Sequence, residues 1–151
     1  MPSQIHNFLQ LSEQIGTGGQ PTAEQFAHLQ QAGYEVVINL ALPDSPQALP
    51  DERAVVESQG MNYIQIPVEF DNPKLTDAEL FLEAMAANEN QQVFVHCVAN
   101  MRVSAFMYVY RVLQQGVNEA VARQDLNKIW QPNQTWQSWI DQMINSPEMR
   151  A

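Results

Sequence analysis

The feature that most constrains the fold is one continuous segment, residues 92–113, in which an apolar run, a tight turn and a longer apolar run follow one another. The first run, residues 92–96, is rich in β-branched and aromatic residues, which is typical of a buried strand. The second run is apolar on almost all sides and is long enough for a helix. A strand, a turn and a helix in this order predict an α/β protein organised around this unit.

The rest of the chain repeats the alternation of strands and helices. Strands are predicted over residues 7–11, 14–17, 35–40 and 62–68. Helices are predicted over residues 22–33, 51–59, 77–88, 118–130 and 135–145. The alternation predicts right-handed βαβ units, a mainly parallel sheet flanked by helices, and a ligand site at the carboxyl ends of the strands. With 151 residues and no linker or repeat, we expect a single domain over residues 1–151.

Three of the predicted helices carry specific expectations about their ends or faces. Thr22 with Gln25, and Thr76 with Glu79, have the spacing of capping boxes. Helical spacing predicts that Leu80, Phe81, Ala84 and Met85 face the core, and that Trp136, Trp139, Ile140 and Met143 do the same in the last helix.

Composition limits the partners of the protein. The formal net charge is −10 and the seven Lys and Arg residues form no cluster, so we expect neither nucleic-acid nor anionic-membrane binding. No apolar run approaches the ~18 residues of a transmembrane helix. The first residues have neither a basic nor an apolar leader segment. We therefore expect a cytoplasmic protein, or a periplasmic one if a leader has been removed.

The chemistry of the central turn depends on Cys97, which is the only cysteine and cannot form an internal disulfide. It follows the predicted strand directly after His96, and Arg102 stands where the helix begins. Backbone N–H groups at a helix N-terminus bind anions, and the helix dipole and a nearby arginine both favour a cysteine thiolate. The alternative is a buried structural cysteine. Since the three histidines are scattered and no metal-binding spacing occurs, we expect no metal and no cofactor.

The segment from Val95 to Ser104 resembles the signature loop of the cysteine-dependent protein tyrosine and dual-specificity phosphatases. From residue 8 to residue 144 the chain also resembles a bacterial group of phosphatase-like proteins, called the β-lactamase-hydrolase-like family. The similar blocks are Gly19-Gln20-Pro21-Thr22, Val36-Val37-Ile38-Asn39-Leu40, Ile66-Pro67-Val68 and the Cys97 loop. The resemblance implies a phosphatase-type, three-layer α/β fold with a central sheet of four to five strands.

This resemblance implies a hydrolysis of phosphomonoesters through a cysteinyl-phosphate. Cys97 would attack phosphorus, His96 would support the loop, and Ser104 would hydrogen-bond the sulfur. Asp71 is the first candidate for the general acid and Asp44 the second, although an aspartate before Asn-Pro or Ser-Pro is also a common turn residue. The phosphate would be held by the loop and the start of the helix, that is by Val98, Ala99, Asn100, Met101, Arg102, Val103 and Ser104.

The loop departs from the phosphatase pattern by one residue. Four residues separate Cys97 from Arg102 instead of five, so that Val103 occupies the usual arginine position while Ser104 stays in register. Asn100 stands at a usual glycine position, and asparagine is the non-glycine residue that best tolerates a left-handed backbone. A shift of one residue at a helix start turns a side chain by about 100°.

The shortened loop leaves three functions open. The first is a phosphatase acting on a phosphorylated small molecule or a phosphoprotein. The second is a rhodanese-like sulfurtransferase, because four residues between cysteine and arginine also fit a rhodanese loop. The third is a module that binds phosphate or a phosphorylated partner without turnover. The sequence leaves the oligomeric state open.

Overall fold

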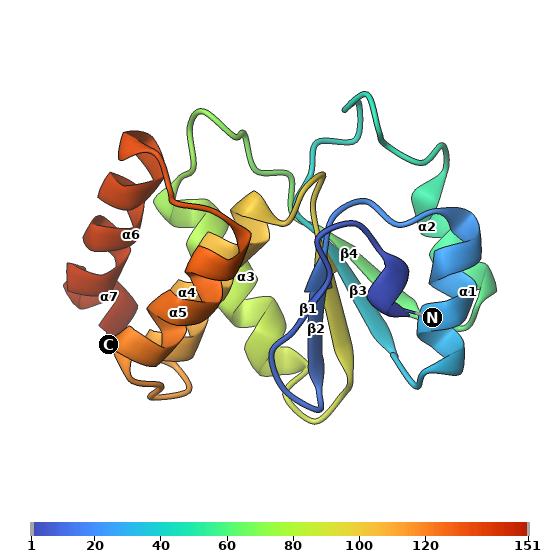
Figure 1. The fold of residues 1–151 in the computed structure, drawn as a ribbon, viewed down its shortest axis with the longest axis horizontal. Helices are drawn as coiled ribbons and strands as arrows, with labels where there is room; N and C mark the ends of the chain where they lie inside the picture. The colour runs from blue at the N-terminus through green and yellow to red at the C-terminus, as the bar shows by residue number, and fades with distance from the viewer. Residues whose placement is uncertain (1, 151) are drawn as a thin grey trace.

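The computed structural model describes residues 2–150 and has a five-stranded sheet at its centre (Figure 1). The strands, in spatial order, are β1 (Leu9–Gln10), β2 (Ile15–Gly18), β5 (Val93–His96), β3 (Val36–Asn39) and β4 (Asn62–Gln65). Neighbouring strands are parallel except for β1 and β2, which are antiparallel. The predicted mainly parallel sheet is confirmed, and its central strand is the one that leads to Cys97.

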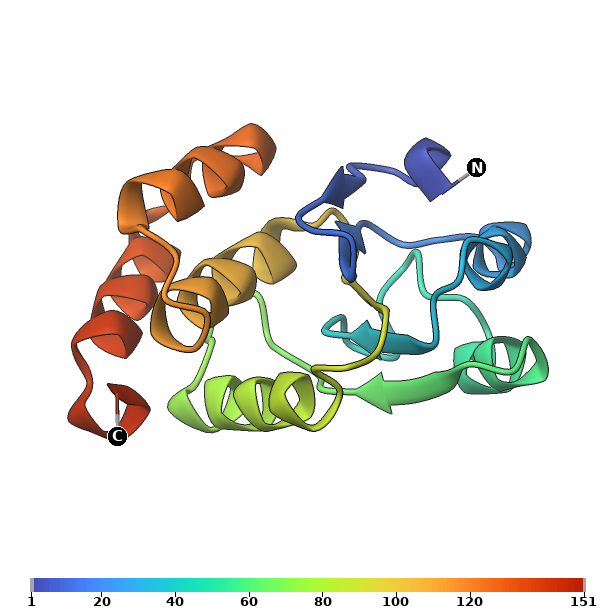
Figure 2. The same ribbon diagram turned by 90° about the horizontal axis from the view of Figure 1, so that it is seen from below.

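Helices cover both faces of this sheet. They are η1 (Pro2–Gln4), α1 (Ala23–Gln31), α2 (Glu52–Ser58), α3 (Leu75–Ala87), α4 (Met101–Leu113), α5 (Glu119–Ile129), α6 (Gln134–Asn145) and α7 (Pro147–Arg150). Figures 1 and 2 show α1 and α2 on one side of the sheet and the larger group, α3 to α6, on the other. The three-layer architecture is therefore as predicted.

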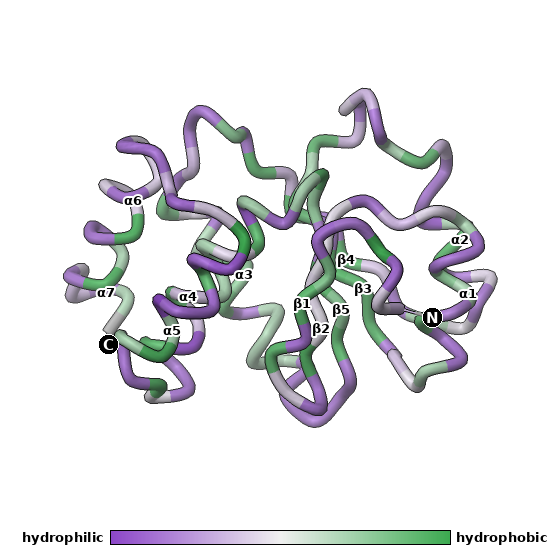
Figure 3. The backbone as a smooth tube through the Cα atoms, viewed as in Figure 1, coloured by the Kyte–Doolittle hydropathy of each residue, from purple (hydrophilic) through white to green (hydrophobic). Residues whose placement is uncertain are grey.

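The alternation of side chains along the strands divides the apolar residues between two cores. In β3, Val36 and Ile38 pack with the α3–α6 side, whereas Val37 packs with α1 and α2. In β5, Val95 and Phe94 divide in the same way. This division follows from the two-residue period of a strand with helices on both faces. Figure 3 shows the resulting apolar colouring of the central strands.

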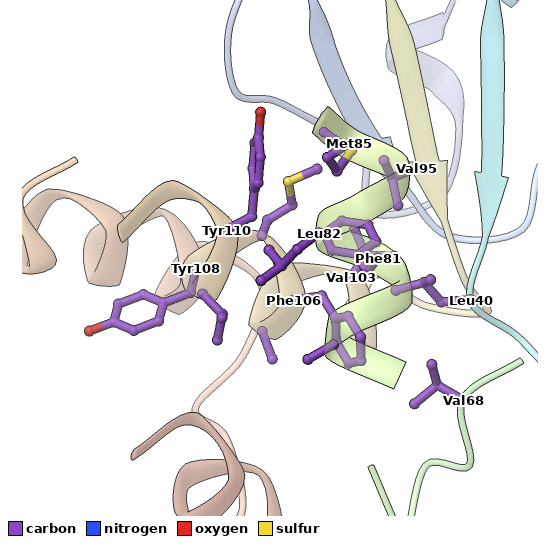
Figure 4. Packing of buried hydrophobic residues seen from close by; sticks show 14 of the residues in the cluster. Leu40, Val68, Phe81, Leu82, Met85, Val95, Val103, Phe106, Tyr108 and Tyr110 are labelled. Atoms are coloured by element: carbon purple, nitrogen blue, oxygen red, sulfur yellow. The ribbon is translucent and has the colours of Figure 1, made fainter. Parts of the chain in front are cut away.

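Helix α4 is buried over nine consecutive residues, 102–110. It packs against β2 as well as α3, α5 and α6, so it has no side that faces only water. Figure 4 shows Phe106 and Val103 of this helix close to Phe81 and Leu82 of α3. This burial explains a helix that is apolar on almost every side. Within residues 2–150, no helix is long and apolar enough to span a membrane.

The capping box at Thr22 is confirmed: the Thr22 hydroxyl accepts the Gln25 N–H at 3.1 Å, and the Gln25 side chain accepts the Thr22 N–H at 3.0 Å. The capping box predicted at Thr76 is wrong. Helix α3 begins at Leu75, and its N-cap residue is Lys74. The Lys74 backbone N–H donates to the Asp77 carboxylate at 3.1 Å. Because the helix starts one residue before Thr76, Thr76 lies inside its first turn and cannot be the N-cap.

The predicted inner face of this third helix is partly wrong as well. Phe81 and Met85 are buried, but Leu80 is 53% exposed and Leu82 is buried in its place. The buried positions 78, 81, 82 and 85 follow a single helical stripe, and position 80 lies outside it. The last helix agrees with expectation, because Trp136, Trp139, Ile140 and Met143 are all buried.

Candidate active site

The Cys97 loop leaves the carboxyl end of β5 and is held by the turn that follows β2. The Cys97 N–H donates to the Gly18 carbonyl at 3.3 Å, and the Gln20 N–H donates to the Val98 carbonyl at 3.0 Å. A Cβ atom at Gly19 would lie 2.5 Å from the Val98 carbonyl oxygen and would clash with it. The glycine in the Gly19-Gln20-Pro21 block is therefore required by the close approach of the two loops.

Asn100 ends the loop in the left-handed conformation, with φ 67° and ψ 1°, as its position in the sequence predicts. Its side-chain amide donates to the Asn7 carbonyl at 2.8 Å and to the Thr17 hydroxyl at 3.1 Å. These hydrogen bonds tie the start of α4 to the N-terminal segment and to β2. The first N–H groups of α4 then have no acceptor within their own helix, which leaves them free for an anion.

Cys97 and Arg102 meet in one pocket, which holds about 210 Å³ of space for solvent. Both side chains are almost completely buried, with 1% and 7% of their surface exposed. The pocket is lined by Cys97, Val98, Ala99, Met101, Arg102 and Phe70. The pocket thus brings together Cys97 and Arg102, both predicted as catalytic, with three of the loop residues predicted to bind phosphate.

Two residues of the loop that follows β4 contact the Arg102 guanidinium. Its Nη1 atom donates to the Val68 carbonyl at 2.9 Å, and its carbon atom lies 5.9 Å from the centre of the Phe70 ring. No ion pair to Arg102 occurs among residues 2–150. A guanidinium has five N–H donors, so one hydrogen bond to a carbonyl leaves donors for a ligand.

Val103, at the usual arginine position of phosphatase loops, points away from the pocket. It is fully buried in the core beneath α4, where Figure 4 places it near Phe81. The side chain that lines the pocket therefore comes from the preceding residue, Arg102. An apolar side chain at position 103 is explained by this packing.

The Ser104 hydroxyl has partners other than the Cys97 sulfur in this structure. The Ser104 hydroxyl donates to the Met101 carbonyl at 2.8 Å and accepts the Trp130 indole N–H at 3.0 Å. Its single proton is used within α4, and its oxygen faces α5. Because Ser104 lies one turn into the helix, it contributes to the α4–α5 contact and does not donate to Cys97.

His96 contacts the loop and also a carboxylate that the sequence does not single out. Its Nδ1 atom lies 3.2 Å from the Cys97 carbonyl oxygen, and its Nε2 atom lies 2.8 Å from Glu52 Oε2. Glu52, at the start of α2, also accepts hydrogen bonds from Gln20 at 2.7 Å and from Asn39 at 3.2 Å. The only signal for this network in the sequence is that Gln20 and Asn39 belong to the blocks that resemble the phosphatase family.

Burial by itself would raise the pKa of Glu52, but the His96 hydrogen bond and charge, with hydrogen bonds from Gln20 and Tyr63, bring that pKa below its usual value of 4.5. Burial also raises the pKa of the neighbouring Tyr63 hydroxyl. Glu52 is therefore a carboxylate near neutral pH, although only 7% of its surface is exposed.

The two candidate general acids lie in loops and do not line the pocket. Asp71 is exposed, but its neighbour Phe70 forms one wall of the pocket. The Phe70 carbonyl accepts the Trp136 indole N–H at 2.8 Å, which places this loop against α6. Asp44 is exposed in the loop after β3. No group of three or more His, Cys, Asp or Glu suited to a metal ion occurs among the described residues.

A family model described as "DSP-PTPase phosphatase fused to NAD+ Kinase" matches residues 6–142 of the chain. The chain belongs to this family. Among the relatives of this DSP-PTPase chain is the beta-lactamase hydrolase-like protein of Agrobacterium fabrum, which is 29% identical over 124 residues, 78% of this chain and 27% of the relative. The chain spans about a quarter of the length of the curated relatives it matches.

Solved structures show the same fold. A DUF442 phosphatase-like protein from Shewanella putrefaciens CN-32 is 39% identical, with a TM-score of 0.84 over 93% of this chain and 92% of that one. The core catalytic domain of the PP-IP phosphatase SIW14 from S. cerevisiae has a TM-score of 0.79 at 19% identity, covering 97% of this chain and 90% of that one. P. aeruginosa TpbA, solved as a cysteine-to-serine variant with pTyr, has a TM-score of 0.74 at 18% identity, covering 99% of this chain and 90% of that one. The fold of this DSP-PTPase chain is thus the phosphatase-type α/β fold implied by the resemblance of its sequence.

Proposed function

We propose that this protein is a cysteine-dependent phosphatase that hydrolyses a phosphomonoester through a cysteinyl-phosphate. One observation carries the proposal: Cys97 and Arg102 share a pocket at the N-terminus of a buried helix, in a chain of the DSP-PTPase family. A thiolate at this position is favoured by the helix dipole and by the guanidinium.

In the first step the Cys97 sulfur attacks phosphorus, the S–P bond forms and the P–O bond of the ester breaks. The N–H groups of the loop and the free donors of Arg102 bind the phosphoryl oxygens. Asp71, beside the pocket wall, gives its proton to the leaving oxygen. In the second step water attacks phosphorus, Asp71 takes the proton, and the S–P bond breaks to release phosphate and the thiolate.

The walls of the pocket favour a substrate with a single phosphoryl group on an apolar carrier, such as an aryl phosphate. Phe70, Val98, Ala99 and Met101 are apolar, and Arg102 is the one basic side chain among the residues that line the pocket. Lys74, four residues after Phe70 in the chain, has its amine 4.0 Å from the Glu69 carboxylate and does not line the pocket. A carrier with several phosphates would need more cations than these residues offer. The TpbA structure with pTyr is consistent with an aryl carrier.

The test is hydrolysis of an aryl phosphate with chelator present, for wild type, Cys97→Ser, Arg102→Lys and the control Arg123→Lys, which lies on α5 and donates to Gln137. We expect Cys97→Ser to fall to background and Arg102→Lys to lose about 10²–10³-fold in kcat/KM, because lysine cannot replace the fork of a guanidinium. Arg123→Lys should behave as wild type.

Two other experimental results would indicate a different function. Transfer of sulfur from thiosulfate to cyanide that depends on Cys97 would identify a sulfurtransferase, which the four-residue spacing between Cys97 and Arg102 favours. Binding of phosphate or vanadate with no turnover on any aryl phosphate would identify a binding module on the same fold.

A further inference from the structure

The Glu52–His96 pair is a buried polar cluster that the proposed reaction does not use directly. It joins the turn after β2, the end of β3, the start of α2 and the end of β5, which all lie at the carboxyl edge of the sheet. The His96 side chain is fully buried and that of Glu52 is 6% exposed. Burying a charged pair costs desolvation free energy, and this cost is offset only when the donors and acceptors of both side chains form hydrogen bonds.

The hydrogen bonds around Glu52 establish its ionisation state. Gln20 Nε2 faces the Pro21 carbonyl at 3.0 Å as well as Glu52 Oε1, so this atom is the N–H₂ group and donates to both. Asn39 Oδ1 accepts the Ala41 N–H at 2.9 Å, so Asn39 Nδ2 is the donor towards Glu52 Oε2. Both carboxylate oxygens accept a hydrogen bond from an amide N–H₂ group. Burial raises the pKa of Glu52, but hydrogen bonds from His96 and Gln20 to the charged form bring that pKa below its usual value. Glu52 is therefore a carboxylate.

The same reasoning extends to the two nitrogens of His96. Nε2 faces the Glu52 carboxylate, and Nδ1 faces the Cys97 carbonyl oxygen; both partners are acceptors only. Both ring nitrogens must carry a proton for the two contacts to be favourable, which makes the ring an imidazolium. The Phe94 ring is stacked on it with centroids 6.0 Å apart, an arrangement that suits a cation.

We propose that Glu52 is a positioning residue that keeps His96 doubly protonated, and that the resulting buried imidazolium orients the Cys97 carbonyl and stabilises the Cys97 thiolate. The consequence for turnover rests on the proposed phosphatase function, whereas the effect on the thiol does not. Arg102 follows Cys97 in the chain and stands one residue earlier than the usual arginine. His96 precedes Cys97 and supplies a second positive charge.

The titratable and charged groups around this pair come from four elements. Glu52 faces His96 from α2, and Tyr63 of β4 reaches the network through Asn39. Arg102 of α4 lines the pocket with Cys97, and Asp71 lies in the loop that borders it. Of these groups, Glu52 is the one that contacts the His96 ring directly.

The experiment measures His96 and Cys97 without using turnover. In wild type at pH 7, nitrogen NMR of the histidine rings should show two protonated nitrogens for His96, and His96→Asn identifies the signal. The rate of Cys97 alkylation by iodoacetamide is then followed against pH; a single cysteine makes the readout unambiguous. Glu52→Gln keeps the shape and removes the charge, and Glu57→Gln, an exposed carboxylate on the same helix, is the matched control.

We expect the alkylation midpoint to rise by about one pH unit or more in Glu52→Gln and to stay unchanged in Glu57→Gln. Glu52→Gln should also leave one nitrogen of His96 unprotonated at pH 7, and adding His96→Asn should cause little further shift. A neutral His96 ring in wild type overturns the proposal even if Glu52→Gln fails to fold, and so does an unchanged midpoint in a folded Glu52→Gln. If these results hold while no phosphatase turnover occurs, only the proposed function fails.

Discussion

At the scale of single residues, the site depends on one side chain that combines an unusual backbone with unusual hydrogen bonds. Asn100 adopts φ 67° and its amide donates both to Asn7 and to Thr17. A glycine would accept this backbone without strain but lose both hydrogen bonds. An alanine would lose the hydrogen bonds and be strained as well.

We therefore expect the free energy of unfolding to decrease in the order wild type, Asn100→Gly, Asn100→Ala. The glycine variant should lose about 1–2 kcal/mol from the missing hydrogen bonds, and the alanine variant about 1 kcal/mol more from left-handed strain. Urea denaturation at fixed pH measures both differences. Equal losses in the two variants would mean that the left-handed backbone contributes no strain here.

At the scale of elements, α6 holds the loop that borders the pocket. The Trp136 indole donates to the Phe70 carbonyl at 2.8 Å, and the Phe70 ring lies 5.9 Å from that of Trp136 and 5.7 Å from that of Trp130. The loop with Asp71 is thus tied to a helix more than 60 residues later in the chain. The position of this loop beside the pocket therefore depends on its hydrogen bond to α6 as well as on the sheet.

Trp136→Phe should loosen this loop because it removes the indole N–H and keeps an aromatic ring in the core. We expect a loss of about 1–2 kcal/mol in stability, a Tm lower by about 3–6 °C, and faster amide exchange at residue 72, whose N–H donates to the Glu69 carbonyl. Trp130→Phe, which loses a hydrogen bond to Ser104 instead, is the comparison. Unchanged exchange at residue 72 in Trp136→Phe would show that the hydrogen bond does not order the loop.

At the scale of the whole molecule, the proposed anion site belongs to a strongly negative protein. The formal net charge is −10, so its long-range field repels anionic reagents, while the positive groups at the pocket act only at short range. Salt shortens the Debye length from about 30 Å at 0.01 M to about 8 Å at 0.15 M, which screens the repulsion more than the local contacts.

The ratio of Cys97 alkylation rates with iodoacetate and with neutral iodoacetamide should therefore rise by a factor of about 2 to 5 between these two ionic strengths. The neutral reagent corrects for any effect of salt on the thiol itself. A ratio that falls with salt would show that the local positive field dominates even at low ionic strength.

The sequence by itself determined the features that depend on neighbouring residues. The strand, turn and helix around Cys97, the capping box at Thr22 and the left-handed position of Asn100 were all predictable, because periodicity, capping and backbone preference act over a few residues. The mainly parallel sheet followed from the alternation of these local elements.

Tertiary structure alone decided which side chains meet. Glu52 lies 44 residues from His96 and becomes its partner only because the start of α2 and the end of β5 lie at the same edge of the sheet. Packing of α4 turned Val103 into the core and Ser104 towards Trp130, which left Arg102 to line the pocket. Leu80 is exposed for a similar reason. Burial depends on the elements that pack against a side chain, and residue spacing within one element does not identify them.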